Sequence, residues 1–251
     1  MTASKEGQRC CKAEPARVKL TVSILEVNMG TVNILNRLSM APAKTVAELR
    51  PYHHGDLRRA LIDAALELVT EGQDWSFSLR EVARQAGVSH NAPYNHFGEK
   101  RDLLAAVAAV GFEMLRDRML GATRKTRGAA AALNAAAYAY VSFAVENPAL
   151  YRLMFGPALA EDNTPRPAVT KQAGAEAKAV LERIILRGAR SGLFALAPGD
   201  ETALGMAILS CWSAVHGLAM LIVDGKAEVE LPHRDLVQGL MRNFLDGIRK
   251  R

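Results

Sequence analysis

The 251-residue sequence predicts an all-α fold in which a small three-helix head is joined by a fourth helix to a larger helical body. Three observations predict it. Apolar side chains recur at the helical spacing i, i+3, i+4 and i+7 through most of the chain after residue 50, where alternating strand patterns are nearly absent. Capping residues precede several of these apolar stripes, and glycine or proline follows them, which is typical of helix ends.

The first three helices are predicted to lie close together in the chain. The first ends near Gly72, and the second opens at Ser78. There the letters SLRE predict a capping box, in which the Ser78 hydroxyl accepts from the Glu81 N–H and the Glu81 carboxylate reaches back. Gly87 supplies the left-handed residue that ends this helix, and Ser89 caps a third helix two residues later. This arrangement predicts a helix-turn-helix.

The remaining helices are predicted from the same signals at about residues 99–121, 129–146, 148–156, 170–191, 200–223 and 232–249. The basic letters ATRKTRG, which follow the first of these helices, indicate a seam between domains. We therefore expect a head domain at 50–121 and a body domain at 126–251. A polar, proline-rich loop at 157–169 interrupts the body.

Composition excludes several classes of protein. The chain is 49% hydrophobic and 23% charged, and its formal charge of +6 is spread along the whole length, so charge alone indicates no partner. The three cysteines, Cys10, Cys11 and Cys211, have neither disulfide nor metal-ligand spacing. We expect a reducing, cytoplasmic compartment, no metal and no cofactor. The apolar run at 20–25 is too short for a signal peptide.

One uncharged run, from Leu204 to Val223, is long enough to span a membrane. It contains two serines, Trp212 and His216, has acidic flanks, and lacks the basic cluster that orients a spanning helix. We therefore predict a helix that is buried on most sides within the protein, and no membrane partner.

Four stretches resemble one known family. FSLREVARQAGVSHNAPYNHFGEKRDLLAAVA (77–108) resembles the DNA-binding head of TetR-type (TetR/AcrR) bacterial transcription regulators, and YHHGDLRRALIDAALELV (52–69) resembles the family's first helix. NPALYRLMF and CWSAVHGLAML in the body resemble a branch marked by Trp-His-Gly. The likeness covers about 50–248 and is most specific over 78–104. It implies a homodimeric repressor whose head reads double-stranded operator DNA and whose body binds a small effector that releases the DNA.

The resemblance assigns the third helix to the major groove, where His90, Asn91 and Asn95 meet base edges; asparagine suits adenine. It also implies phosphate or sugar contacts from Tyr94 and His96 and a phosphate contact from Lys100. A further phosphate is expected at Ser78 and the N–H groups that begin the second helix. The predicted DNA-binding set is Ser78, Ser89, His90, Asn91, Ala92, Pro93, Tyr94, Asn95, His96 and Lys100.

Other readings stay open for part of this set. His96 could pack beside Phe97, which with Val88 is assigned to the core, while Tyr94 could cover the head and Lys100 could be a solvated charge. Tyr52, His53 and His54, ahead of the first helix, suit either DNA-backbone contacts or simple solvation. Pro93 lies in the first turn of the third helix, where we expect the helix to survive it.

The resemblance also implies an effector pocket in the body. Its predicted lining is aromatic or apolar apart from one histidine, so the effector is expected to be largely apolar: Tyr140, Phe143, Tyr151, Met154, Phe155, Trp212 and His216. Trp212 and His216 lie one helical turn apart, hence on one face. The alternative is core packing, with His216 satisfied by a backbone carbonyl. The last two helices are expected to pair with those of a second subunit.

Two other classes of function were weighed. An enzyme is not expected, because Cys211 and His216 lie about 140° apart around one helix and cannot form a dyad within it. A glycine-rich phosphate loop and a paired metal-ligand motif are also missing from the sequence. The alternative function is a DNA-binding or architectural protein that responds to no ligand.

Residues 1–49 form an atypical extension that holds an internal echo, TVSIL at 21–25 and TVNIL at 31–35. A β-hairpin is one interpretation, because apolar residues alternate from Val18 to Ile24. The other hypothesis is that the segment is translated upstream DNA and that Met40 is the working start. Ten codons span about three turns of B-DNA, so a repeated operator read in frame would leave this mark and would imply autoregulation.

Overall fold

A computed structural model of the chain describes residues 54–159, 165–228 and 231–249. Within these ranges the backbone forms eight α-helices and two short 3-10 helices without a β-strand, so the all-α prediction is confirmed. The elements are α1 (His54–Gly72), α2 (Leu79–Gln85), η1 (Pro93–Asn95), α3 (Lys100–Thr123), α4 (Ala129–Glu146), α5 (Pro148–Phe155), η2 (Pro157–Leu159), α6 (Ala168–Arg190), α7 (Glu201–Val223) and α8 (His233–Ile248).

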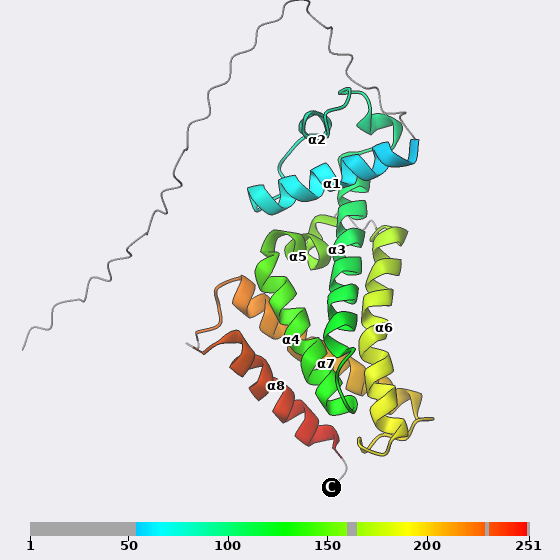
Figure 1. The fold of residues 1–251 in the computed structure, drawn as a ribbon, viewed down its shortest axis with the longest axis vertical. Coiled ribbons are helices and arrows are strands. Elements are labelled where there is room, and N and C mark those ends of the chain that lie inside the picture. The colour runs from blue at the N-terminus through cyan, green and yellow to red at the C-terminus, as the bar shows by residue number, and fades with distance from the viewer. Residues whose placement is uncertain (1–53, 160–164, 229–230, 250–251) are drawn as a thin grey trace, which may run out of the picture. The chain divides into compact units, whose positions relative to one another are not determined.

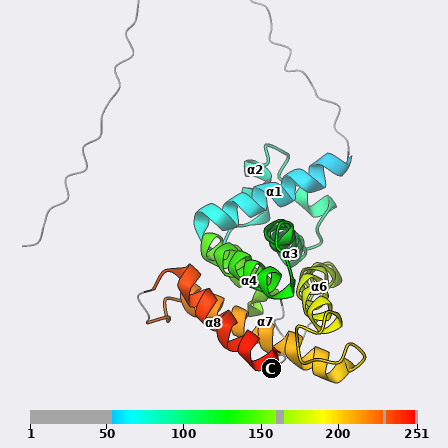
Figure 2. The same ribbon diagram turned by 60° about the horizontal axis from the view of Figure 1, so that its bottom comes forward.

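Helix α3 is the central helix of the described fold. Figure 1 shows α1 lying across one end of α3, with α2 beyond it, while the rest of α3 runs between α4 and α6. Figure 2 shows α3 nearly end-on, surrounded by α1, α4 and α6. Helices α7 and α8 pack against α4 on the side away from α1. The same helix therefore belongs to the head and to the body.

One cluster of buried apolar side chains extends from α1 to α8. Leu61, Val69 and Val82 are fully buried in the head, and Phe97, at 3% exposure, joins the core as the sequence predicts. Val88 is partly buried against this cluster. Because the core is continuous along α3, the division into domains at 50–121 and 126–251 stays a prediction.

The predicted third helix is shorter and tighter than expected. The segment from Ser89 forms turns followed by the 3-10 helix η1, and its bonds run from the Ala92 N–H to the Ser89 carbonyl (2.8 Å) and from the His96 N–H to the Pro93 carbonyl (3.0 Å). Pro93 explains the difference. It has no N–H to donate to Ser89, and its ring crowds that carbonyl, so an α-helical bond cannot form there.

The prediction that the apolar run at Leu204–Val223 is buried on most sides is wrong for the single chain. Helix α7 buries only one stripe, formed by Ala207, Cys211, Val215 and Ala219. It is the one described helix that meets the length and composition criteria for a membrane span, with a mean hydropathy of 1.9, which is weak support for a span. A stripe with a spacing of four residues faces the body, and no described residue of the chain covers the large apolar side chains on the opposite face.

The predictions about residues 1–49, Tyr52 and His53 lie outside the described residues, as does the side chain of His54.

Candidate DNA-binding surface and effector cavity

Helix α2 begins with the capping box that the sequence predicts. The Ser78 N–H and hydroxyl both donate to Glu81 Oε2, at 2.7 and 2.8 Å, and the Glu81 N–H donates to Ser78 Oγ at 3.3 Å. The backbone and side-chain hydrogen bonds from Ser78 lower the pKa of the Glu81 carboxyl, which is therefore ionised at neutral pH. This carboxylate occupies the helix N-terminus, so a phosphate contact at Ser78 meets a like charge.

Half of the predicted DNA-binding residues are exposed on the segment between α2 and α3: Ser89, His90, Asn91, Tyr94 and Asn95. Gly87 lets the chain leave α2 with a φ of +67°, a conformation that favours glycine. Ser89 Oγ then accepts from the Asn91 N–H at 3.4 Å. The exposed amides and imidazole both donate and accept hydrogen bonds, as base edges in the major groove require.

Four of the predicted DNA-binding residues are less accessible. Ala92, at 9% exposure, and Pro93 are buried, so their side chains pack inside the head and hold the turn in place. His96 is half-buried, and so is Lys100, whose ammonium lies 5.1 Å from the centroid of the Phe77 ring. This cation–π geometry holds the Lys100 stem against the head and leaves its charge near the surface.

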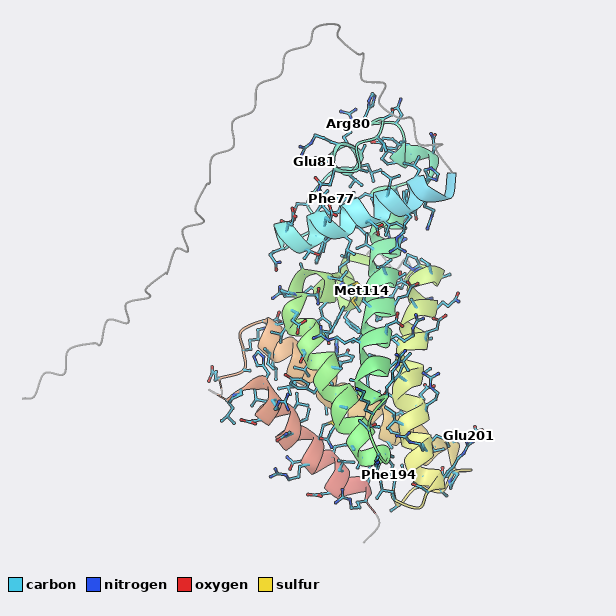
Figure 3. All side chains as sticks on the ribbon, in the orientation of Figure 1. Phe77, Arg80, Glu81, Met114, Phe194 and Glu201 are labelled. Atoms are coloured by element: carbon cyan, nitrogen blue, oxygen red, sulfur yellow. The ribbon has the colours of Figure 1, made fainter. Side chains whose placement is uncertain are left out.

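Arg80 is an exposed cation of the head that the sequence-based set omitted. It lies on α2, two residues after Ser78 and off the buried face of that helix. Figure 3 places Arg80 at the outer end of the head, far from Phe194 and Glu201 in the body. A cation that lies in a helix-turn-helix and off its apolar stripe is typical of a phosphate contact, so the sequence alone could have indicated Arg80.

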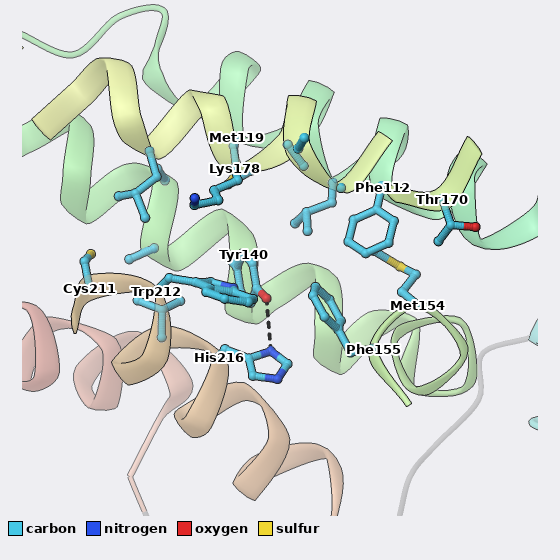
Figure 4. Close-up of a pocket in the computed structure, with 18 of the residues that line it drawn as sticks. Phe112, Met119, Tyr140, Met154, Phe155, Thr170, Lys178, Cys211, Trp212 and His216 are labelled. Carbon is cyan, nitrogen blue, oxygen red and sulfur yellow. Dashed lines mark hydrogen bonds between the residues drawn. The ribbon is translucent and has the colours of Figure 1, made fainter. Parts of the chain in front are cut away.

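The body contains a cavity of about 430 Å³ between α3, α4, α5, α6 and α7 (Figure 4). Of the seven predicted effector-binding residues, five line it: Tyr140, Met154, Phe155, Trp212 and His216. Phe143 and Tyr151 are buried, at 1% and 0% exposure, outside the lining. Most of the remaining wall is apolar, including Phe112 and Leu115 of α3. The size and lining are those of a small-molecule site.

Tyr140, Tyr151 and His216 form a hydrogen-bonded triangle in one wall of the cavity. The Tyr151 hydroxyl oxygen lies 2.6 Å from His216 Nδ1 and 3.1 Å from the Tyr140 hydroxyl oxygen, which lies 3.2 Å from Nδ1. Burial lowers the pKa of His216, which is therefore neutral at pH 7. Burial also raises the pKa of Tyr140 to about 12, and that of Tyr151 as well. Two phenols, rather than a backbone carbonyl, thus satisfy this histidine.

Three cations in the cavity wall were not among the predicted residues: Arg166, Lys171 and Lys178. Arg166 donates to the carbonyls of Met154, Phe155 and Gly156, so it satisfies backbone acceptors at the C-terminal end of α5. Burial lowers the pKa of its guanidinium. The sequence carries no sign of these positions, because Arg166 falls in the predicted polar loop and lysines on a helix are usually solvated. Only the packing of α6 over α4 and α7 brings them to the cavity.

Helix α5 touches both the cavity and the head. It contributes Met154 and Phe155 to the cavity wall, and it also packs against α1 and α3. Its approach to α3 is close at Gly111, where an added Cβ would lie 2.7 Å from Met154 Sδ and 3.1 Å from Leu150 Cδ1. Movement of α5 at the cavity would therefore reach α3 and α1 through direct contacts.

Helix α7 carries large apolar side chains that nothing in the described chain covers. Met206, Leu209 and Leu221 are 58%, 49% and 47% exposed. They lie about opposite the buried stripe of α7, with Ser213 and Gly217 between them on the same face. Small residues flanked by large apolar ones make a surface suited to close helix packing.

Cys211, the candidate nucleophile of the sequence, is a protonated thiol. Cys211 is buried and free, and burial raises the pKa of its thiol to about 12, so it carries no thiolate at neutral pH. Within the described ranges no three His, Cys, Asp or Glu side chains gather as a metal site would require.

Comparison with known proteins places both halves in one family. The family of bacterial regulatory proteins named tetR matches residues 61–107, and the tetracyclin repressor-like C-terminal domain matches residues 133–244. The HTH-type transcriptional regulator YobS of Bacillus subtilis strain 168 is 25% identical over 77% of this chain and 93% of its own.

Two solved structures share the fold. A protein of unknown function from Rhodococcus sp. RHA1 is 32% identical, with a TM-score of 0.66 over 80% of this chain and 100% of its own. The transcriptional regulator FadR of Bacillus subtilis, solved in complex with stearoyl-CoA, is 17% identical, with a TM-score of 0.60 over 76% of this chain and 99% of its own.

Proposed function

The chain belongs to the TetR family of DNA-binding transcription regulators, and we propose that it is a homodimeric repressor that a small, largely apolar effector releases from its operator. The proposal rests on the position of one helix, because α5 lines the 430 Å³ cavity and also packs against α1 of the head. A ligand in the cavity can therefore act on the DNA-binding segment through contacts already in place.

The proposed DNA contacts follow from exposure. His90, Asn91 and Asn95 read base edges, while Tyr94 and Lys100 contact phosphates or sugars. Two changes are made to the set predicted from sequence: Ala92 and Pro93 are support residues, and Arg80 is added as a phosphate contact. The element that enters the groove carries no Arg or Lys, so phosphate charge is met by Arg80 on α2 and by Lys100 at the start of α3.

The second subunit is proposed to cover the exposed face of α7, together with α8. This four-helix arrangement buries Met206, Leu209 and Leu221 and leaves the cavity and the head of each subunit free. A two-fold dimer presents two reading segments, whose separation must be about 34–36 Å for adjacent half-sites of B-DNA. Effector binding is proposed to move α5 and the end of α3, and so to change that separation.

The test is operator release. Selection of binding sites from random DNA gives the operator, and gel shifts with and without a broad panel of small molecules measure release. The proposal expects at least one compound that abolishes the shift while the protein stays dimeric in sedimentation. An operator affinity that no compound changes would instead support a ligand-independent DNA-binding protein. FadR, which shares the fold and was solved with stearoyl-CoA, supports including acyl compounds in the panel.

Asn95→Ala is expected to weaken operator binding by about 10- to 100-fold and to relax base preference at one position in each half-site. A bidentate amide–adenine contact contributes about 1–3 kcal/mol of discrimination, and each 1.4 kcal/mol is about tenfold. Competition gel shifts with all four bases at each position measure both effects. Gln172→Ala removes an exposed amide from α6 and should change neither. If base preference is the same in Asn95→Ala and wild type, Asn95 does not read the operator.

Autoregulation rests on the sequence echo at 21–25 and 31–35 alone. We expect a DNase footprint of the protein over codons 18–38 of its own gene, and a native N-terminus at Met40. A footprint that lies wholly outside these codons, together with a mass spectrum showing the full N-terminus, rules this part of the proposal out.

A further inference from the structure

The charged side chains in the wall of the cavity are all cationic. The wall contains three cationic side chains, Arg166, Lys171 and Lys178, and none of the described residues that line it is acidic. All three come from α6 or the residues just before it. Since the wall is otherwise mostly apolar, a ligand cation would be repelled here and a ligand anion attracted.

Lys178 is the cation that Figure 4 shows extending from α6 over the side of the cavity where Tyr140 and Trp212 lie. Its ammonium is 3.2 Å from Glu182, one helical turn along α6, and both side chains are about half exposed. An exposed pair of this kind contributes little to stability, so the ammonium can exchange Glu182 for a ligand at small cost.

Tyr140 offers a hydrogen bond on the side of the cavity that Lys178 covers. If His216 carries its proton on Nδ1, that N–H donates to Tyr151, the Tyr151 hydroxyl donates to Tyr140, and the Tyr140 hydroxyl is left to donate into the cavity. The other tautomer reverses the chain and uses the Tyr140 proton within it. An acceptor in the cavity favours the first arrangement, because there the Tyr140 hydroxyl donates to it without the loss of a hydrogen bond within the triangle.

From this wall we infer that the effector is an organic carboxylate with an apolar body, held by Lys178 and the Tyr140 hydroxyl on one side of the cavity. This inference rests on the proposed function and names the class of its effector. The volume of about 430 Å³ admits on the order of 14 non-hydrogen atoms, since a water-sized group occupies about 30 Å³. A medium-chain fatty acid or an aryl-alkyl acid has this size.

The test uses probes of equal chain length and different charge on the purified full-length protein. Decanoate, decan-1-ol, decylammonium and decanoyl-coenzyme A are titrated calorimetrically into the wild type and into Lys178→Gln, Lys178→Glu and Arg183→Gln. Arg183 is the matched control, because it is exposed on α6 and lies outside the cavity wall. Operator release by each probe is measured separately by gel shift.

We expect decanoate to bind at least about tenfold more tightly than decan-1-ol, as one charge-assisted hydrogen bond provides. Lys178→Gln should remove most of this difference by weakening decanoate alone, Lys178→Glu should make decylammonium the preferred probe, and Arg183→Gln should resemble the wild type. Equal binding of decanoate and decan-1-ol, or binding of decanoyl-coenzyme A without decanoate, overturns the inference.

The two proposals fail in different ways. If decanoate binds with the expected dependence on Lys178 but the operator stays bound, release by the effector is wrong and the ligand class stands. If decan-1-ol releases the operator as well as decanoate does and Lys178→Gln has no effect, release stands and the carboxylate inference is overturned.

Discussion

Leu209→Glu is expected to convert the proposed dimer into a folded monomer and to weaken operator binding by at least about 100-fold. Leu209 is 49% exposed on α7, on the face opposite the stripe that packs into the body, so a charge there disturbs little within the described part of the chain. In a two-fold dimer the change places two carboxylates in one apolar interface. Two like charges that face each other across an interface cost several kcal/mol, which weakens the affinity between the subunits by more than about 100-fold.

Sedimentation equilibrium measures the state of association, and gel shifts with the selected operator measure affinity. Val169→Glu is a matched control, because Val169 is also a large apolar residue, 45% exposed, but lies on α6 away from this face. It should stay dimeric and bind the operator normally. If Leu209→Glu remains dimeric with unchanged helicity, the dimer does not use this face of α7.

Phe194→Ala is expected to lower the free energy of unfolding by about 3–5 kcal/mol. Phe194 is 2% exposed and packs its ring on Gly188, near the end of α6, where an added Cβ would lie 2.1 Å from Phe194 Cε2. The backbone N–H groups of Leu193 and Phe194 both donate to the Gly188 carbonyl, at 3.1 and 3.2 Å, which fixes the ring at this place. Gly188→Ala should therefore also destabilise, because the buried ring has to move.

The two changes are expected to be coupled. In the Phe194→Ala background Gly188→Ala should cost much less, since its methyl group enters the space the ring has left. Chemical denaturation at a fixed protein concentration measures the four free energies, which keeps any contribution of dimer formation constant. Gly121→Ala is the control: an added Cβ there meets nothing within 4 Å, so its stability should equal or exceed that of the wild type. Strictly additive losses would mean that Gly188 and Phe194 do not act through this contact.

The helices were predictable because their signals are local. The end of α1 at Gly72, the box between Ser78 and Glu81, and the glycine at 87 each depend on residues within one or two turns, and the described chain has all three. The exception, at Ser89, is also local: the missing N–H of Pro93 and the crowding by its ring outweighed the capping signal, and the α-helix became a 3-10 turn. The expectation that an α-helix survives Pro93 is therefore wrong.

The cavity was only partly predictable. Tyr140 was placed in it as an aromatic residue of the body, and Trp212 by its place in a stretch that resembles a family pattern. Tyr151, from the other such stretch, supports the wall through its bond to His216 and does not line it. Arg166 gave no signal, because a charged residue in a polar loop is usually solvated. Its role depends on the carbonyls at the end of α5, which are free to accept only because that helix ends there.

Periodicity and capping therefore specify where helices run and which face of each is apolar, since those properties are set by neighbours along the chain. They could not say that no other described helix would cover the second apolar face of α7, or that α6 would bring Lys178 over Tyr140. Whether an apolar face is buried, and which charge faces which hydroxyl, depends on contacts between residues far apart in sequence. Those contacts arise from the packing of the helices against one another, which no single segment encodes.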